Sequence, residues 1–426
     1  MMESTTFRVE DVVAFKLQAL RWAAQFPVVC LLDSNSYSDD GYASLEWQLA
    51  VDAIREYEGK EEAFEGLKKF WLEAEQPCFG GFSYDLKNQI ERLEPNEGKG
   101  FGFPLIYFFE PRYLITIEGN EVTVNRNYPE TFELRERIQN YKHQNIILPP
   151  IELKASTTKA HYLKQVEAIR EQIGNGDFYE MNYCCEFTSV GTAIDPVQVF
   201  ERLNATAAAP FSTFFKWKKK YLLCASPERF LKKTGDMLIS QPIKGTIRRA
   251  ADATENEELM RRLYTSEKER SENVMIVDLV RNDLAVSAIA GTVKVPELFG
   301  VYTFNTVNQM ISTVTAQLQP VVSGIDAIRR AFPMGSMTGA PKVEVMKNID
   351  RYETQKRGWY SGAVGYMLPD GDFDLNVVIR AIQYDAGQQL ISVQAGGAIT
   401  YDSVPEQEYD ELLLKIEAMK KALGAS

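Results

Sequence analysis

The sequence predicts an α+β protein with a large buried core. Its 426 residues are 45% hydrophobic and 11% aromatic, so the chain exceeds the usual size of one domain and has ample apolar material for an interior. Strand-like runs such as "FPVVCLLDS", "FPLIYFFEPRYLITI" and "NEVTVN" stand beside helix-like acidic segments such as "EEAFEGLKKFWLEAE". We therefore expect one large domain or two closely associated ones.

A connecting stretch, "HQNIILPPIELKASTTKAHY", separates an N-terminal region, 1–150, from the remainder, 151–426. The segment "AHYLKQVEAIREQIGNGD" follows it and predicts a helix, because its apolar residues recur at helical spacing before a Gly-Asn-Gly-Asp turn. The two histidines of the chain, His143 and His161, both fall around this connection. A Ser-His-Asp arrangement and a histidine-rich metal site are therefore disfavoured, which leaves lysine and carboxylates for chemistry.

The composition argues against several classes of partner. The formal net charge is −12 and the longest basic run is the short "KWKKKY", which argues against a nucleic-acid surface. No window reaches the roughly 18 apolar residues of a membrane span, and the start "MMESTTFRVEDVV" is too polar for a signal peptide. The 5 cysteines include no CxxC pair, so neither a disulfide framework nor a zinc site is indicated. A cytoplasmic protein is expected.

Two pairs of glutamates are the first candidates for a site. Glu269 and Glu272 lie three residues apart in "SEKERSENVMIVDLVRNDL", a segment of helical period. Glu408 and Glu411 repeat the spacing in "EQEYDELLLKIEAM", with Lys415 one turn later. Residues so spaced share one face of a helix. A solvated acidic surface has this pattern, and so does a magnesium site, because Mg²⁺ is often held by one or two carboxylates, waters and an anionic substrate.

The segment "FPMGSMTGAPKVEVMK" resembles a phosphate loop only superficially. A Walker A motif needs Gly-Lys-Ser/Thr in sequence, whereas here Ala340 and Pro341 follow the last glycine. A sharp turn that packs a helix is expected instead, with Pro341 at the first helical position.

A pair of strands is predicted near the C-terminus, in "FDLNVVIRAI" and "QLISVQAGGAITYDS". Arg380 in the otherwise apolar first strand needs an anion, either a structural carboxylate or a bound one. Gly396 and Gly397 in the second strand mark close approach of a ligand or of another backbone.

Lys244 lies in a tight Pro-Ile-Lys-Gly-Thr turn within "ISQPIKGTIRR". Taken alone, a solvated loop lysine is the ordinary interpretation. In combination, however, the segments "QPIKGTIRR", "SENVMIVDLVRNDL", "MTGAPK", "RGWYSGAVGY", "VVIRAI" and "YDSVPEQEYDELLLK" resemble, in order, the chorismate-utilising enzyme family. The resemblance is dense over roughly residues 160–420 and weaker in the N-terminal "CLLDS" and "CFGGFSYDL".

This resemblance implies an anthranilate synthase component I-like fold, with two packed antiparallel sheets flanked by helices, to which both chain regions contribute strands. It also implies a magnesium-dependent site between the sheets that binds chorismate. Glu272 and Glu411 would be the inner metal ligands, with Glu269 and Glu408 behind them. The residues that would hold the substrate are Gly245, Tyr366, Arg380, Gly396, Gly397 and Lys415.

The residue after Pro-Ile in the lysine turn separates two branches of the family. Alanine there resembles anthranilate synthase, and lysine resembles aminodeoxychorismate synthase, in which the amine adds to the chorismate ring as the 4-hydroxyl leaves and ammonia then displaces it. Lys244 is thus the expected nucleophile. An ordinary lysine is neutral in only about one molecule in 2,500 at pH 7, so we expect burial or nearby magnesium to lower its pKa.

Several residues depart from the family pattern. Gln309, in "NTVNQMIS", stands where many relatives have a histidine assigned to the leaving hydroxyl, so Lys244, Thr246 or a metal-bound water could donate the proton instead. Glu180 replaces a usual glutamine, in the position where isochorismate and salicylate synthases carry a basic lysine, which argues against activation of water.

The resemblance also implies partners. The chain has no nucleophilic-cysteine turn of the glutaminase kind, so ammonia is expected from a separate glutamine amidotransferase subunit, and a lyase is expected downstream. Alternatives are anthranilate synthase component I, an isochorismate or salicylate synthase, and a non-catalytic chorismate-binding relative. A tryptophan pocket near "CLLDS", as in some relatives, stays open.

Overall fold

The computed structural model describes residues 3–37, 41–91, 93, 97–126, 131–142, 146 and 150–425. His143 lies outside these residues. His161 is exposed near the start of a helix, where its ring is 3.0 Å from Gln165 Nε2. Among the described residues, no helix combines the length and apolar character needed to cross a membrane.

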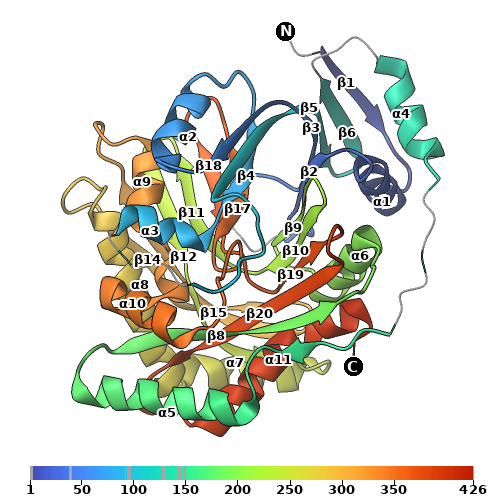
Figure 1. Cartoon of the computed structure of the whole chain (residues 1–426). Coiled ribbons are helices and arrows are strands. Elements are labelled where there is room, and N and C mark those ends of the chain that lie inside the picture. Colours follow the sequence, from blue (N-terminus) through green and yellow to red (C-terminus); the bar gives the residue numbers. More distant parts are fainter. Residues whose placement is uncertain are drawn as a thin grey trace.

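The strands of the described chain pair antiparallel and form one hydrogen-bonded network (Figure 1). From neighbour to neighbour, its main path runs through β15 (Val307–Gln317), β12 (Met237–Gln241), β11 (Arg229–Thr234), β18 (Phe373–Asn376), β17 (Ala363–Met367), β4 (Cys78–Phe82), β5 (Ile106–Glu118), β3 (Trp47–Gly59), β2 (Val28–Asp33), β9 (Phe211–Trp217), β10 (Lys220–Ser226), β19 (Ala381–Asp385), β20 (Leu390–Ile399) and β8 (Glu180–Val190).

Shorter branches leave this path at three strands. β13 (Ile243–Arg248) and β14 (Lys294–Thr303) pair with β15. β6 (Glu121–Arg126) pairs with β5 and is followed by β1 (Glu3–Arg8), while β7 (Lys154–Ala155) and β16 (Gly339–Ala340) pair with β8.

The predicted α+β class is confirmed. The two halves of the structure are joined in a single strand network through β4, β5 and β3, rather than forming two separate sheets. A cluster of buried side chains draws on strands from both halves and includes Phe79, Tyr107, Phe215 and Trp359. Because β2 pairs with β9 and β4 with β17, the N-terminal strands are built into the same network as the later ones.

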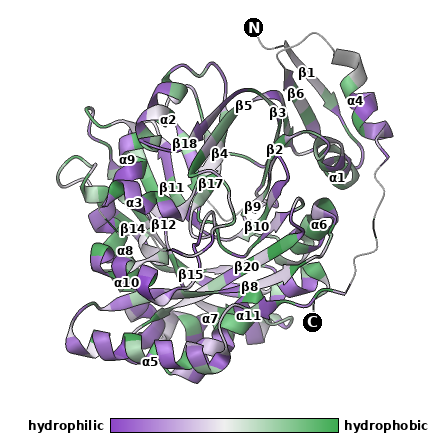
Figure 2. Ribbon diagram, viewed as in Figure 1, coloured by the Kyte–Doolittle hydropathy of each residue, from purple (hydrophilic) through white to green (hydrophobic). Residues whose placement is uncertain are grey.

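The helices lie on the outside of this network (Figure 1). They are α1 (Val12–Ala23), α2 (Ala63–Leu72), α3 (Lys87–Ile90), α4 (Thr131–Asn140), α5 (Lys159–Asn175), α6 (Pro196–Ala207), α7 (Ala253–Thr265), α8 (Glu267–Ala285), α9 (Gly324–Ala331), α10 (Lys342–Tyr352) and α11 (Pro405–Leu423), with short 3₁₀ turns at Tyr84–Leu86 and Gly335–Met337. Figure 2 shows α5 as largely hydrophilic along its outer side. Helix α8 packs against β13 and β15, and α11 packs against β20, which brings both predicted glutamate pairs to the strand network.

Most of the elements expected from the sequence are present. The predicted helix after the connection is α5, which buries Tyr162, Val166 and Ile169 and is capped at its C-terminus by Gly176, with φ of 87°. Two details differ. Pro341 precedes the first helical residue of α10 instead of occupying it, since its ψ of 138° is extended. Arg380 lies between strands and not within one.

The displacement of Arg380 follows from the topology. β18 pairs within one half of the network, with β11 and β17, whereas β19 pairs with β10 and β20 in the other half. The chain must therefore cross between the halves over residues 377–380, and Arg380 adopts φ of 52° at the end of this crossing. This places its side chain at the junction of the two halves, where the C-terminal helix also arrives.

Candidate active site

Lys244 is held by a buried carboxylate. Its Nζ lies 2.9 Å from Glu180 Oε1, and the two side chains are 12% and 1% exposed. Lys244 comes from β13 and Glu180 from the first position of β8, so strands from opposite ends of the main path meet here. Lys244 is therefore not a solvated loop residue, which was the ordinary interpretation of its segment taken alone.

The tight turn predicted at Lys244 is instead an irregular stretch of strand β13, and Gly245 lies at the irregularity. The pairing of β13 with β15 is irregular between Ile243 and Thr246, and Gly245 has φ of 89°, a conformation that favours glycine. A Cβ at this position would lie 3.0 Å from Glu269 Oε2. This stretch of β13 thus packs directly against α8, which carries the first glutamate pair.

The pKa of Lys244 differs from the sequence-based expectation. Burial lowers the pKa, as expected, but the negative charges of Glu180, Glu272 and Glu228 raise it by more, so it stands above its ordinary value. In this structure Lys244 is therefore an ammonium. A reaction that uses it as a nucleophile has to remove a proton first.

Glu228 is a site residue that the sequence analysis missed. It lies between β10 and β11, is 5% exposed, and is close enough to Lys244 for their charges to interact. Burial raises its pKa to about 7, although Ser336 and Lys244 lower it. A carboxyl group with such a pKa can hold or release a proton near neutral pH. The sequence "ASPERF" gives no sign that this glutamate is buried.

The four predicted glutamates come together from two helices. Ser266 caps α8, which carries Glu269 and Glu272, and Glu408 and Glu411 occupy the first two turns of α11. Burial and the charge of Glu411 raise the pKa of Glu269, whereas Lys268 lowers it. The carboxylates of α8 and α11 therefore interact electrostatically. Burial likewise raises the pKa of Glu272 to about 7.

The two glutamates of α11 are in different surroundings. Glu408 is 8% exposed and accepts a hydrogen bond of 2.8 Å from Ser403 Oγ. Glu411 is half exposed, and the ammonium of Lys415 lowers its pKa. The cluster therefore combines an ionised carboxylate at the surface with carboxylates that burial and mutual repulsion discourage from ionising.

This donor set fits a magnesium ion. Its members are all carboxylates, the oxygen ligands that Mg²⁺ prefers, and a cation would offset the burial and the repulsion that together raise the pKa of Glu269 and Glu272. Within the described chain, no three acidic, histidine or cysteine side chains are gathered closely enough to bind a metal by themselves. The residues therefore suit an ion that takes one or two carboxylates and completes its shell with water and an anionic substrate.

Arg380, Lys415 and the glycine strand form a cationic edge beside the glutamates. Lys415 Nζ donates to the carbonyl of Gly396 at 2.8 Å, and Arg380 Nη1 donates to the carbonyl of Lys415 at 2.8 Å. A Cβ at Gly397 would lie 3.3 Å from Glu408 Oε2 and 3.6 Å from Lys415 Nζ. Strand β20 therefore lies directly beside the charged groups of α11, next to Lys415 and Arg380.

Tyr366 does not lie with this group. It projects from β17 into a separate cavity, next to Ser44 and Asp374. Tyr360, six residues earlier, is instead buried near Arg380, with its hydroxyl 3.9 Å from Cys184 Sγ. The segment "RGWYSGAVGY" contains two tyrosines, and its strand begins only at Ala363, so the sequence pattern alone does not separate them.

Thr246 and Gln309 face each other across the β13–β15 pair. Gln309 Nε2 is 3.4 Å from Thr246 Oγ1, a long contact, while Gln309 Oε1 is buried without a hydrogen-bond partner. Glu180 Oε2 and Asn273 Nδ2 are likewise buried and unpaired. Unsatisfied buried polar atoms are costly, so the free oxygen of Glu180, beside Lys244, marks a place where a bound group would complete the hydrogen bonding.

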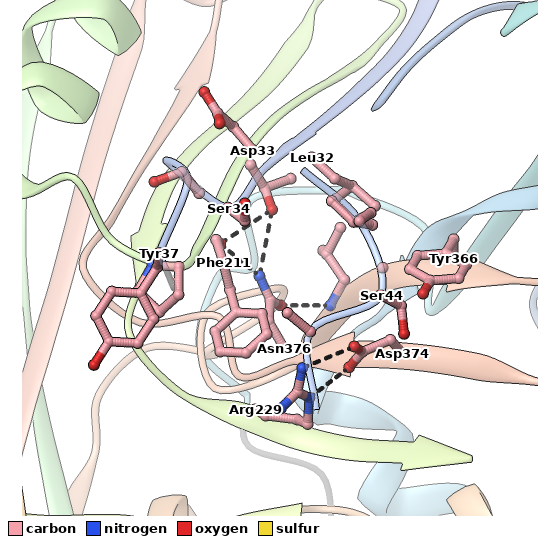
Figure 3. Close-up of a pocket in the computed structure, with 17 residues that line it drawn as sticks. Leu32, Asp33, Ser34, Tyr37, Ser44, Phe211, Arg229, Tyr366, Asp374 and Asn376 are labelled. Atoms are coloured by element: carbon pink, nitrogen blue, oxygen red, sulfur yellow. Dashed lines mark hydrogen bonds and ion pairs between the residues drawn. The ribbon is translucent and has the colours of Figure 1, made fainter. Parts of the chain in front are cut away.

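A second cavity lies at the predicted "CLLDS" segment, between β2, β9, β17 and β18. It is a partly open hollow of about 480 Å³, a volume that includes open solvent, and Figure 3 shows Asp33 and Ser34 at one side and the Arg229–Asp374 pair at another. Arg229 Nε is 2.9 Å from Asp374 Oδ1, and its Nη1 contacts Gln241. Since Arg229 directly follows Glu228, this cavity and the Lys244 region share one stretch of backbone.

The family model for a chorismate binding enzyme matches residues 30–421. Aminodeoxychorismate synthase component 1 of Escherichia coli (strain K12) is 35% identical over 356 residues, which cover 81% of this chain and 76% of that protein. The protein of the same name from Salmonella typhimurium is 32% identical over 413 residues, covering 96% of this chain and 88% of its own. An anthranilate synthase component I-like protein of Synechocystis is 30% identical over 352 residues, covering 81% of this chain and 72% of its own.

Solved structures agree on the fold. Anthranilate synthase component I from Streptococcus pneumoniae superposes with a TM-score of 0.78 at 23% identity, covering 90% of this chain and 95% of that one. The menaquinone-specific isochorismate synthase from Escherichia coli gives 0.77 at 17% identity, covering 99% and 94%. The resemblance to the chorismate-utilising enzymes is confirmed: the chain belongs to the chorismate binding enzyme family.

Proposed function

We propose that this protein is the chorismate-aminating component of an aminodeoxychorismate synthase. It would replace the 4-hydroxyl of chorismate by an amino group and give 4-amino-4-deoxychorismate, a precursor of 4-aminobenzoate and folate. The names of the Escherichia coli and Salmonella relatives support this assignment. The observation that carries it is the buried Lys244, placed against the carboxylate cluster where an anthranilate synthase-like chain would have alanine.

The residues present can perform the steps of this reaction. Arg380 and Lys415 would bind the substrate carboxylates, and the glycines of β20 would let the ring approach the backbone. Lys244 would add to the ring, and Glu228, with a pKa of about 7, would protonate the leaving hydroxyl in place of the histidine that Gln309 replaces. Magnesium, held by Glu272 and Glu411 with Glu269 and Glu408 behind them, would withdraw electron density from the ring through its carboxylate.

Ammonia would come from a separate glutamine amidotransferase subunit, which the designation "component 1" of the relatives supports, and a lyase would consume the product. A glutaminase assay on the isolated chain should therefore give no ammonia.

Product analysis tests the proposal. The protein is incubated with chorismate, Mg²⁺ and an ammonium salt at alkaline pH, and the products are separated with and without added lyase. We expect 4-amino-4-deoxychorismate, converted to 4-aminobenzoate by the lyase. Anthranilate, isochorismate or salicylate as the main product would assign the chain to another branch, and binding without turnover would make it a non-catalytic relative.

We also propose that the second cavity binds a small amphiphilic molecule of the tryptophan kind. Leu32, Leu45 and Phe211 supply apolar walls, and Ser34 and the Arg229–Asp374 pair supply polar groups at two sides. Calorimetric titration with tryptophan should give saturable binding. Absence of binding would remove this proposal and leave the catalytic one intact.

A further inference from the structure

The backbone of Glu180 is held in place by close contacts with the Gly339–Ala340 segment. Its backbone pairs with Ala340, and the neighbouring Tyr179 N–H donates to the carbonyl of Ala340 at 2.8 Å. A Cβ at Gly339 would lie only 2.0 Å from the carbonyl oxygen of Glu180. The "GSMTGAPK" turn therefore clamps the start of β8, so the Glu180 side chain has little freedom to move away from Lys244.

Only one of the two carboxylate oxygens of Glu180 has a hydrogen-bond partner. Oε1 accepts from Lys244 Nζ at 2.9 Å, whereas Oε2 is buried and has no hydrogen-bond partner. A buried ion pair is weak evidence for a stabilising role, because the cost of removing both charges from water roughly cancels their attraction. A half-satisfied buried carboxylate beside a reactive amine therefore calls for a chemical explanation.

We propose that Glu180 is the general base of this site, which takes the proton from the Lys244 ammonium and so frees the amine for attack. The inference rests on the proposed amination reaction and deepens it. The pair has the donor–acceptor distance that direct proton transfer requires, and the resting ammonium needs an acceptor before it can act. Transfer within the pair turns two opposite buried charges into two neutral groups, which a water-poor site tolerates.

The proton and electron balance closes over the cycle. The proton passes from Lys244 Nζ to Glu180 Oε1. The freed electron pair on Nζ forms a bond to the ring, the ring double bonds shift, and the bond to the 4-hydroxyl breaks, with Glu228 supplying the proton that makes water. Ammonia then forms a bond at the vacated carbon, the pair returns to Nζ as its bond to the ring breaks, and Glu180 gives its proton back to Lys244. Solvent reprotonates Glu228.

Other charged groups face the pair and set its electrostatic surroundings. They are Glu269 and Glu272 from α8, Glu228 from the connection of β10 to β11, and Glu411 from α11. All four are acidic, so each favours the protonated lysine. Glu180 differs from them because it alone is recorded within hydrogen-bond distance of Nζ in the described chain.

A purely electrostatic role for Glu180 predicts the opposite behaviour from a base. If Glu180 only holds Lys244 and keeps it protonated, Glu180→Gln should lower the lysine pKa and speed its attack near neutral pH. If Glu180 is the base, the same substitution should slow the attack, because the proton then has to leave through water. Glutamine nearly preserves the shape of the side chain and is the usual family residue here.

The test measures covalent adduct formation with chorismate and Mg²⁺ but without ammonia, by rapid quenching and intact-protein mass spectrometry between pH 6.5 and 9.5, a range chosen to span roughly three decades of proton activity. For Glu180→Gln we expect a rate at pH 7 lower by about 100-fold, rising about tenfold per pH unit as hydroxide replaces the missing base. Asp385→Asn is the matched control: it removes another lysine–carboxylate pair, with Lys220, away from the site, and should leave the rate unchanged.

The outcomes separate the two proposals. If the unmodified protein forms neither adduct nor 4-amino product, the proposed function fails, whatever Glu180 does. If it reacts and Glu180→Gln reacts equally fast or faster at pH 7, Glu180 is not the base. Chorismate binding by the variant verifies its fold. Should it be misfolded, Glu180→Ala with added formate decides: recovery of the adduct supports the base, and no recovery in a chorismate-binding variant overturns it.

Discussion

Lys415 and Glu411 form an ion pair one turn apart on α11, with 2.7 Å between Nζ and Oε1. The same ammonium donates to the carbonyl of Gly396, so it connects the helix to the glycine strand as well. Since Lys415 lowers the pKa of Glu411, this carboxylate is ionised at neutral pH. The proposed substrate-binding lysine and the proposed metal ligand are thus adjacent on one helical turn.

The inner glutamates should be essential. Glu272→Gln and Glu411→Gln should each reduce Mg²⁺-dependent turnover below detection, because an amide is a far weaker ligand than a carboxylate for a hard dication. Glu269→Gln and Glu408→Gln should be milder. Steady-state rates across an Mg²⁺ titration test this, and wild-type activity in both inner variants would reduce the cluster to an acidic surface.

The two tyrosines of "RGWYSGAVGY" should separate by their effect on substrate binding. Tyr360→Phe removes a buried hydroxyl near Arg380 and should raise KM for chorismate about 10-fold or more, as expected for loss of a hydrogen bond to a charged group. Tyr366→Phe, in the second cavity, should leave KM unchanged. The reverse pattern would return Tyr366 to the substrate site.

The Glu353–Arg357 pair should be a stability determinant. Both side chains are 1% exposed, Nη2 and Oε1 are 2.6 Å apart, and Glu353 also accepts from the Cys184 N–H at 2.8 Å. Glu353→Gln leaves a buried guanidinium poorly compensated and should lower the free energy of unfolding by about 3–5 kcal/mol. The control is Glu258→Gln, in an exposed pair with Arg261, which should change it by less than about 1 kcal/mol in denaturant melts.

Glu228 should make stability depend on pH. Its pKa rises from 4.5 to about 7 on folding because of burial, so the folded state binds its proton more tightly than the unfolded state does. The resulting stabilisation is fully present below pH 4.5, declines as pH rises, and is lost above about 7, for a total of about 3 kcal/mol. Glu228→Gln should therefore flatten this part of the unfolding profile. An unchanged slope would show that Glu228 is ionised in the folded protein.

The sequence predicted the fold class and the helices that carry the candidate glutamates, because both leave local patterns. Helical periodicity placed Glu269 and Glu272 on α8 and Glu408 and Glu411 on α11, and ordered motifs indicated the family. The sequence did not identify the residues whose role depends on burial. Glu228 lies in the connection between β10 and β11, and Tyr360 in the connection between α10 and β17, where no periodicity indicates which side chains face inward.

Arg380 shows a second limit. An apolar run containing one arginine was predicted as a continuous strand, but the chain breaks there because its two parts belong to different halves of the network. The break is determined by which distant strands β18 and β19 pair with, and the local sequence does not show this. The same holds for Lys244, whose pKa depends on Glu180, Glu228 and Glu272, none of them its sequence neighbours.

The most direct test of the account is the mass of the protein after reaction with chorismate and Mg²⁺ in the absence of ammonia. We predict a fraction of chains heavier by chorismate minus water, with the added mass mapping to "QPIKGTIRR" and absent from Lys244→Ala, which should still bind chorismate through Arg380 and Lys415. Lys244→Arg keeps the charge but not the nucleophilic amine, because guanidinium stays protonated at any working pH, and should also form no adduct. Near-normal amination by Lys244→Arg, or an unmodified mass in the active protein, would contradict covalent catalysis by Lys244.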